Sequence, residues 1–124
     1  TCPKETCLLK HELVSEIVVP LADGKVSRFA KRTRIRGHDL AVVNAAASVA
    51  GGRLKLALGA VAPTPLLLDA FAGIGLEDEE GILKAVLGSI SPIDDVRGSG
   101  SYRRSMVGVL VRNLVRGLKT AAKV

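Results

Sequence analysis

The sequence predicts one α+β domain, in which a three- to four-stranded antiparallel sheet packs against about three helices. Three observations support this fold class. Two alternating apolar segments flank a Gly-Gly pair, another alternating segment precedes them, and amphipathic segments fill the C-terminal half. Strands that come first and helices that follow are typical of an α+β arrangement. A chain of 124 residues has the length of a single domain.

The composition narrows the class of protein. Apolar residues make up 48% of the chain and the mean hydropathy is +0.31, which excludes a disordered polypeptide. No stretch approaches the ~20 consecutive apolar residues of a membrane span. The N-terminus has no apolar core of a signal peptide, and two cysteines form no disulfide framework. We therefore expect a cytoplasmic protein without membrane contacts.

The chain is basic, with a net charge of +6 from 18 basic and 12 acidic residues. Such a charge can indicate nucleic-acid binding, because phosphate neutralisation uses Lys and Arg. The aromatic residues are only Phe29, Phe71 and Tyr102, too few for a platform on which bases stack. We expect no nucleic-acid ligand, and interpret the basic faces as surfaces that meet an acidic partner protein.

The N-terminal third predicts extended structure. Residues 7–20 are rich in Val, Leu and Ile and indicate one or two short extended segments. Turn residues follow at 21–25. In residues 26–34 the side chains alternate, so that Phe29 and Lys31 share one side of a half-exposed strand.

The strongest local pattern is a hairpin over residues 40–62. Gly51-Gly52 suits a two-residue loop, because both central positions of a primed turn favour positive φ. A two-residue loop fixes the register, so that the numbers of opposite residues sum to 103. On the predicted apolar face the pairs are Val49–Leu54, Ala47–Leu56, Ala45–Leu58 and Val43–Ala60.

Three helices are predicted after the hairpin. Pro63 and Pro65 end the second strand, and a short helix over 65–73 ends at Gly73. Residues 77–90 form an amphipathic helix with acidic residues in its first turn. A long helix runs from Ser99 or Ser101 to Ala121. Its predicted apolar stripe contains Tyr102, Met106, Val107, Leu110, Val111, Leu114 and Leu118.

No catalytic site or metal site is predicted. The sequence has neither a Gly-rich phosphate loop after a strand nor a Ser/His/Asp or Cys/His arrangement with supporting context. Asp94 and Asp95 are adjacent, so their side chains diverge and make a poor acid/base pair. The four residues of metal-binding type are too few and too scattered for a zinc or iron–sulfur site: Cys2, Cys7, His11 and His38.

The segment SPIDDVRGSGSYRR, residues 91–104, raises a question of charge. Arg103 and Arg104 fall in the first turn of the long helix, where the helix dipole favours negative charge. An anion must therefore lie nearby. Three sources are open: Asp94 and Asp95 of the chain itself, a ligand, or another subunit.

Four segments in order resemble the C-terminal domain of the FAD-binding subunit of molybdenum hydroxylases, the carbon monoxide dehydrogenase and xanthine dehydrogenase family. The resemblance covers residues 5–118 approximately, and each segment alone would be weak. The segments are ELVSEIVVP, FAKRTRIRGHDLAVVNAAASV, GGRLKLALGAVAPTP and SPIDDVRGSGSYRRSMVGVLVRNLV. One departure is Leu66–Leu68, since the family often has a basic residue after APTP.

The resemblance implies a domain organisation and a function. Residues 1–20 would be a strand-containing lead-in from a preceding FAD-binding domain, and residues 21–124 the flavoprotein C-terminal domain. Electrons would pass from the molybdenum cofactor through [2Fe-2S] clusters to FAD, with those metal centres in partner subunits. The glycine-rich loops that hold the FAD pyrophosphate are absent from this chain. Alone, it is expected to bind FAD weakly or not at all and to catalyse nothing.

The resemblance also implies site residues. Val14 matches an apolar residue near the isoalloxazine ring, and Lys31 a lysine that reaches the flavin. A cation there would stabilise the negative charge of the reduced ring. Asp39 matches an acidic residue that we interpret as structural. The polar network predicted to set the helix entry and dock a partner subunit consists of Asp94, Asp95, Arg97, Tyr102, Arg103 and Arg104.

Two other functions remain open at this point. The chain can be a stand-alone assembly or dimerisation module that keeps the fold without flavin, or a basic nucleic-acid-binding domain. The substrate oxidised at molybdenum, the electron acceptor and the oligomeric state would be properties of other domains or subunits.

Overall fold

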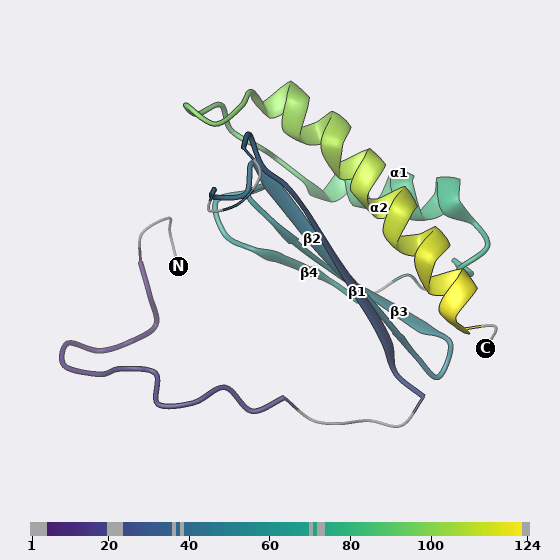
Figure 1. The fold of residues 1–124 in the computed structure, drawn as a ribbon, viewed down its shortest axis with the longest axis horizontal. Coiled ribbons are helices and arrows are strands. Elements are labelled where there is room, and N and C mark those ends of the chain that lie inside the picture. The colour runs from purple at the N-terminus through teal and green to yellow at the C-terminus, as the bar shows by residue number, and fades with distance from the viewer. Residues whose placement is uncertain are drawn as a thin grey trace.

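The computed structural model describes residues 5–19, 24–35, 37, 39–69, 71 and 74–122. Among these, four strands form one antiparallel sheet in the order β1-β2-β3-β4, and two helices lie together on one face of it (Figure 1). The elements are β1 Val26–Arg32, β2 Val43–Ala50, β3 Arg53–Gly59, β4 Leu66–Leu68, α1 Glu79–Ser89 and α2 Gly100–Ala122. The predicted fold class is confirmed, with two helices in the described residues where about three were predicted.

The β2–β3 hairpin is built as predicted. Gly51 and Gly52 have φ values of 53° and 73°, the positive values that a primed turn requires. Three of the four predicted pairs form: Val49 with Leu54, Ala47 with Leu56 and Ala45 with Leu58. The fourth pair, Val43–Ala60, is not in the ladder. β3 ends at Gly59, and Ala60 turns away with a φ of 62°.

The two faces of the sheet differ in what covers them. Val43, Ala45 and Ala47 of β2 are buried, as are Leu56 and Leu58 of β3, and all belong to the core beneath the helices. The intervening residues lie on the opposite face, which no described helix covers (Figure 1). We call this second surface the open face.

Both predicted long helices are present. Asp78 caps α1 by accepting a hydrogen bond from the Gly81 amide at 2.8 Å. The buried side of α2 departs from the predicted stripe at its start, because Tyr102 is 38% exposed whereas Arg103 is only 2% exposed. The apolar residues of α2 that are buried in the core are Val107, Val111, Leu114, Val115 and Leu118.

The predicted helix over 65–73 is wrong in its first turn. Leu66–Leu68 form β4, in which Leu66 pairs with Leu58 and Leu68 with Leu56. A helix there would leave the outer edge of β3 without hydrogen-bond partners, whereas a strand satisfies that edge and packs Leu66 and Leu68 against the core. Gly73, the predicted helix end, lies outside the described residues.

Residues 5–19 form no helix or strand, and all of them are exposed. The extended segments predicted for 7–20 therefore pair with no strand within the described part of the chain. The exposed side chains include Leu13, Val14 and Ile17. The boundary between a lead-in and the domain at residue 20 stays a prediction, because residues 20–23 lie outside the described ranges.

Neither a metal site nor a membrane span is found in the described part. No cluster of three or more His, Cys, Asp or Glu side chains there is suited to a metal ion. Cys7 is a free, exposed thiol, while Cys2 and His38 lie outside the described ranges. None of the helices there is long and apolar enough to cross a membrane.

Candidate functional site

The open face carries an apolar row that crosses all four strands. Phe29 pairs with Ala46, Ala46 with Ala57, and Ala57 with Leu67. Phe29 is 64% exposed and Leu67 is 65% exposed, so large apolar groups stand at both ends of the row. Because the side chains of the two alanines between them are small, the middle of the row projects less from the sheet than its ends. The result is a shallow apolar surface suited to a flat partner.

Lys31 borders this surface. It lies two residues from Phe29 on the same side of β1, opposite Asn44, which in turn lies opposite Gly59. The Asn44 side chain covers Gly59, since a Cβ added at Gly59 would lie 2.6 Å from Asn44 Oδ1. The row next to the apolar one therefore presents an exposed ammonium group beside a side-chain amide. A second lysine, Lys55, borders the apolar row from the other side, since it lies opposite Ser48 and two residues from Ala57.

Asp39 fixes the loop that follows Lys31. Its Oδ2 atom accepts hydrogen bonds from the amides of Arg34, at 2.9 Å, and Ile35, at 3.2 Å. The Arg34 guanidinium lies 3.6 Å from Oδ1. The Ile35 amide, together with the Arg34 contacts, lowers the pKa of Asp39 against the opposing effect of burial. These contacts agree with a structural role.

The segment 91–104 contains a polar cluster centred on Asp95. The Asp95 carboxylate accepts hydrogen bonds from the Arg97 amide at 2.7 Å and from Arg97 Nη2 at 2.7 Å. Arg103 Nη2 lies 2.5 Å from Asp95 Oδ1. The backbones of Asp95 and Gly98 also bond to each other. Asp95 thus holds a tight turn and one buried cation.

Arg103 connects this turn to the sheet. Its Nη1 donates to the carbonyl of Ala60, just after β3, at 3.0 Å, and its Nε donates to Gly98 O at 3.4 Å. Nη2 makes the ion pair with Asp95 but no well-aligned hydrogen bond within the described residues. The anion that Arg103 requires is supplied by the chain itself.

Arg104 finds its partners at the end of the other helix. Its Nη1 donates to Leu87 O at 2.7 Å, and its Nη2 to Ile90 O at 3.3 Å. The last turn of α1 contains no basic residue, so Arg104 provides the cation that the helix dipole favours there. At the start of α2, Asp94 Oδ1 accepts from the Gly100 amide at 2.5 Å.

The structure brings some predicted site residues together and separates others. Asp95, Arg97 and Arg103 form one cluster, whereas Tyr102 points to β1 and accepts a hydrogen bond from Arg32 Nε at 3.1 Å. Val14 is 62% exposed on the N-terminal segment, which runs apart from the sheet that carries Lys31 (Figure 1). These two residues are not brought into one pocket by this chain alone.

Sequence reasoning missed the apolar row. The shared side of Phe29 and Lys31 is visible in the alternation of β1. Their alignment with Leu67 could not be predicted, because the residues of β4 were predicted to form a helix.

The Asp95 cluster predicts a pH dependence of stability. Hydrogen bonds from Arg97, with a further contribution from Arg103, hold the pKa of Asp95 well below its ordinary value of 3.8. A carboxyl group whose folded-state pKa is depressed stabilises the fold above its unfolded pKa, and this stabilisation is lost as the pH falls through 4 and below. We expect urea midpoints of the wild-type chain to fall between about pH 5 and pH 3 more steeply than those of Asp95→Asn. Parallel pH profiles for the two proteins would contradict this role.

Three comparisons relate the chain to known proteins. Residues 28–118 match the family model described as the CO dehydrogenase flavoprotein C-terminal domain. The chain is 36% identical over 118 residues to the glyceraldehyde dehydrogenase medium chain of Sulfolobus acidocaldarius, an alignment that covers 87% of this chain and 42% of that protein.

Solved structures agree with the sequence comparisons. A chain of the reconstituted CO dehydrogenase from Oligotropha carboxidovorans has a TM-score of 0.64 at 29% identity, covering 81% of this chain and 38% of that one. CO dehydrogenase from Hydrogenophaga pseudoflava gives a TM-score of 0.62 at 27% identity, covering 77% and 37%. The present chain thus spans about two fifths of the length of the relatives that it matches.

Proposed function

Because the chain belongs to the family of CO dehydrogenase flavoprotein C-terminal domains, we propose that it forms one wall of a flavin site and a subunit contact in a molybdenum-dependent hydroxylase or dehydrogenase. In this assembly, electrons leave the molybdenum cofactor, pass through [2Fe-2S] clusters in a partner subunit and reach FAD. The chain itself contributes binding surface rather than a reacting group.

The observation that carries this proposal is the position of Lys31 at the edge of the apolar row on the open face. Phe29 and Leu67 form a shallow surface across the sheet, and an exposed ammonium group stands beside it. A planar, partly apolar ring that gains negative charge on reduction suits both properties. Val14 would join this wall when its segment is held against the rest of the flavin-binding protein.

The residues present fit the ring of the cofactor but not its diphosphate. A dinucleotide phosphate binds at a helix N-terminus or a glycine-rich nest after a strand. The N-terminus of α1 carries Asp78, Glu79 and Glu80, which repel a phosphate, and at the N-terminus of α2 the Asp94 carboxylate already accepts from the Gly100 amide. FAD supplies the electron chemistry when bound. We infer that the domains that hold its phosphates lie in the part of the relatives' length that this chain does not span.

Native mass spectrometry of the tagged chain purified from its own host tests the proposal, with the absorption spectrum recorded on the same sample. We expect a yellow complex that contains a molybdenum subunit and an iron–sulfur subunit. A colourless chain associated only with itself would instead identify the stand-alone assembly module.

Replacing Lys31 with alanine tests the flavin wall directly. Loss of the cation is expected to make the flavin midpoint potential in the purified complex more negative by tens of millivolts, since 30 mV corresponds to about 1.4 kcal/mol for a two-electron couple. Lys25→Ala is the matched control, because Lys25 is an exposed lysine just before β1, six residues from Lys31 and four from Phe29. Equal potentials for the two variants at equal FAD content would exclude Lys31 from the flavin's surroundings.

A further inference from the structure

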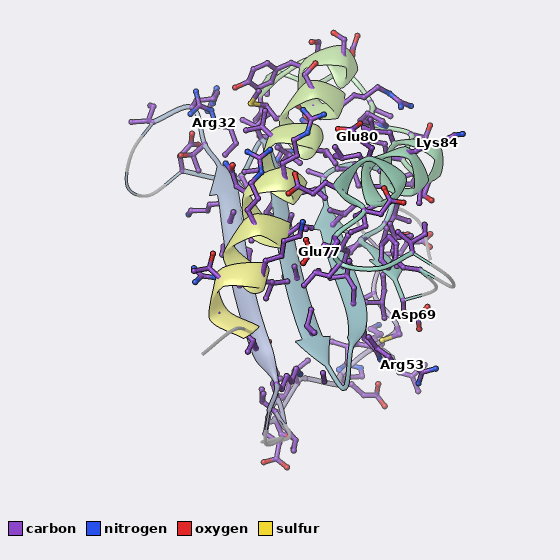
Figure 2. All side chains as sticks on the ribbon, turned by 90° about the vertical axis from the view of Figure 1, so that its right-hand side faces the viewer. Arg32, Arg53, Asp69, Glu77, Glu80 and Lys84 are labelled. Carbon is purple, nitrogen blue, oxygen red and sulfur yellow. The ribbon has the colours of Figure 1, made fainter. Side chains whose placement is uncertain are left out.

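The helix layer contains a groove with no assigned role. It lies between α1 and α2 and has a volume of about 670 Å³. Most of its lining residues are exposed, so the groove opens on the side of the helices away from the sheet. Figure 2 shows Glu80 and Lys84 projecting from α1 beside α2. The lining residues are Glu80, Leu83, Lys84, Leu87, Gly88, Arg104, Ser105, Gly108 and Arg112.

Two glycines create the space. A Cβ added at Gly88 or at Gly108 would meet no heavy atom within 4 Å. Packing within the chain therefore does not require glycine at either position, although Gly108, in the interior of α2, costs about 1 kcal/mol relative to alanine. Each helix therefore lacks a side chain at one position of the groove, and a third element can approach the two backbones closely.

The groove has an apolar floor and a cationic rim. Leu83 and Leu87 form the floor. Lys84, Arg104 and Arg112 stand around it, and the single acidic residue, Glu80, is already paired with Arg112 Nη2 at 3.0 Å. Arg104 bonds to backbone carbonyls, which carry only partial negative charge, and no carboxylate of the described residues forms an ion pair with it. The rim thus carries an excess of positive charge over an apolar base.

We propose that the groove docks an amphipathic, acidic helix of another polypeptide in the assembly. A cleft between two packed helices accepts the apolar face of a third helix, and the polar flanks of that helix then lie against the rim. Carboxylates complement Lys84 and the two arginines. A second copy of this chain is disfavoured, because each copy has a net charge of +6 and would bring cations to a cationic rim. The inference rests on the proposed function in that it requires a partner chain.

Filling the groove is the direct test. Gly108→Leu places an apolar side chain in the cleft, where its Cβ meets no atom within 4 Å, and Asn113→Leu adds the same side chain to an exposed position of α2 outside it. We expect Gly108→Leu to reduce the recovery of one partner chain with the tagged protein at least tenfold. The melting temperature of the isolated chain should stay equal or rise, and Asn113→Leu should retain every partner. Full recovery with Gly108→Leu would overturn the proposal.

The occupant is identified by a photo-crosslinking residue placed at Ser105 on the groove wall. We expect the crosslinked peptide to be acidic, to have apolar residues at helical spacing, and to come from the chain that Gly108→Leu loses. A crosslink to this chain itself, or to a segment without acidic residues, would overturn the proposal. The absorption spectrum of the wild-type complex separates the two hypotheses. A colourless complex would refute the proposal of a flavin wall. The proposal of a docking groove is decided separately, by whether Gly108→Leu loses a partner chain.

Discussion

Replacing Arg103 with alanine is expected to lower the free energy of unfolding of this chain by about 3 kcal/mol, the scale found when one partner of a buried ion pair is removed. The guanidinium is 2% exposed and bonds to Ala60 O, Gly98 O and the Asp95 carboxylate. Its loss leaves a cavity and at least one carbonyl without its donor. Urea denaturation at pH 7 measures the change.

Arg104→Ala is the matched control for this prediction. Arg104 is the next residue of the same helix, but it is exposed, and its bonds to the described residues are those to the two carbonyls at the end of α1. Its loss should cost about 1 kcal/mol. Arg103→Lys should fall between the two, because a lysine keeps the charge but cannot reach three acceptors with a planar fork. If Arg103→Ala and Arg104→Ala lowered the free energy of unfolding equally, the burial of Arg103 would contribute nothing to stability.

Replacing Gly100 with alanine should destabilise the chain by about 1–3 kcal/mol, as overpacking of a close contact does. A Cβ at Gly100 would lie 2.7 Å from the backbone carbonyl oxygen of Pro92 and 3.2 Å from Asp94 Oδ1. The carbonyl belongs to the backbone and cannot rotate away, so the start of α2 must move. This movement would also disturb the hydrogen bond from the Gly100 amide to Asp94.

Gly108→Ala separates this clash from the general effect of replacing a helical glycine. Gly108 lies in the same helix with open space around it, and alanine there should raise stability by up to about 1 kcal/mol. Thermal unfolding of the two variants should therefore shift in opposite directions from the wild type. Shifts of the same sign would show that the close approach of Pro92 is not maintained in solution.

The hairpin shows which features of this fold can be predicted from sequence. Its register follows from local chemistry, because two glycines with positive φ define the turn and the turn defines every pair up to Ala45–Leu58. Helix α1 was equally accessible, with Asp78 before an acidic first turn and an apolar face. In both cases the interactions that decide the structure lie within a few residues of one another.

Leu66–Leu68 show where such reasoning fails, and Arg103 shows where it is incomplete. The three leucines after Pro65 are good helix formers, but the free edge of β3 binds them as a strand. Arg103 was predicted in a network with Asp94 and Asp95 and does pair with Asp95, but its bond to the carbonyl of Ala60, 43 residues away, was not predicted. Whether this network contacts a partner subunit stays a prediction. Contacts between distant segments decide both cases.

The candidate site was predictable only in part. Lys31 and its side of β1 followed from the alternation of the strand, together with the family resemblance. The apolar row beside it depends on the position of β4, and the groove depends on how α1 and α2 pack. Neither the position of β4 nor the packing of the two helices is predicted by a sequence pattern.

The position of α2 has a consequence for how the chain is made. Each strand pairs only with its neighbour in sequence, so the sheet can assemble from short loops as it leaves the ribosome. The helix that packs on β1 and β2 is the last element synthesised in this segment (Figure 1). Until Gly100–Ala122 has emerged, the sheet lacks the cover of its main helix. A pause in translation before Gly100–Ala122 has emerged would therefore leave the apolar face of the sheet exposed and prone to aggregation. A pause after this helix has emerged would not.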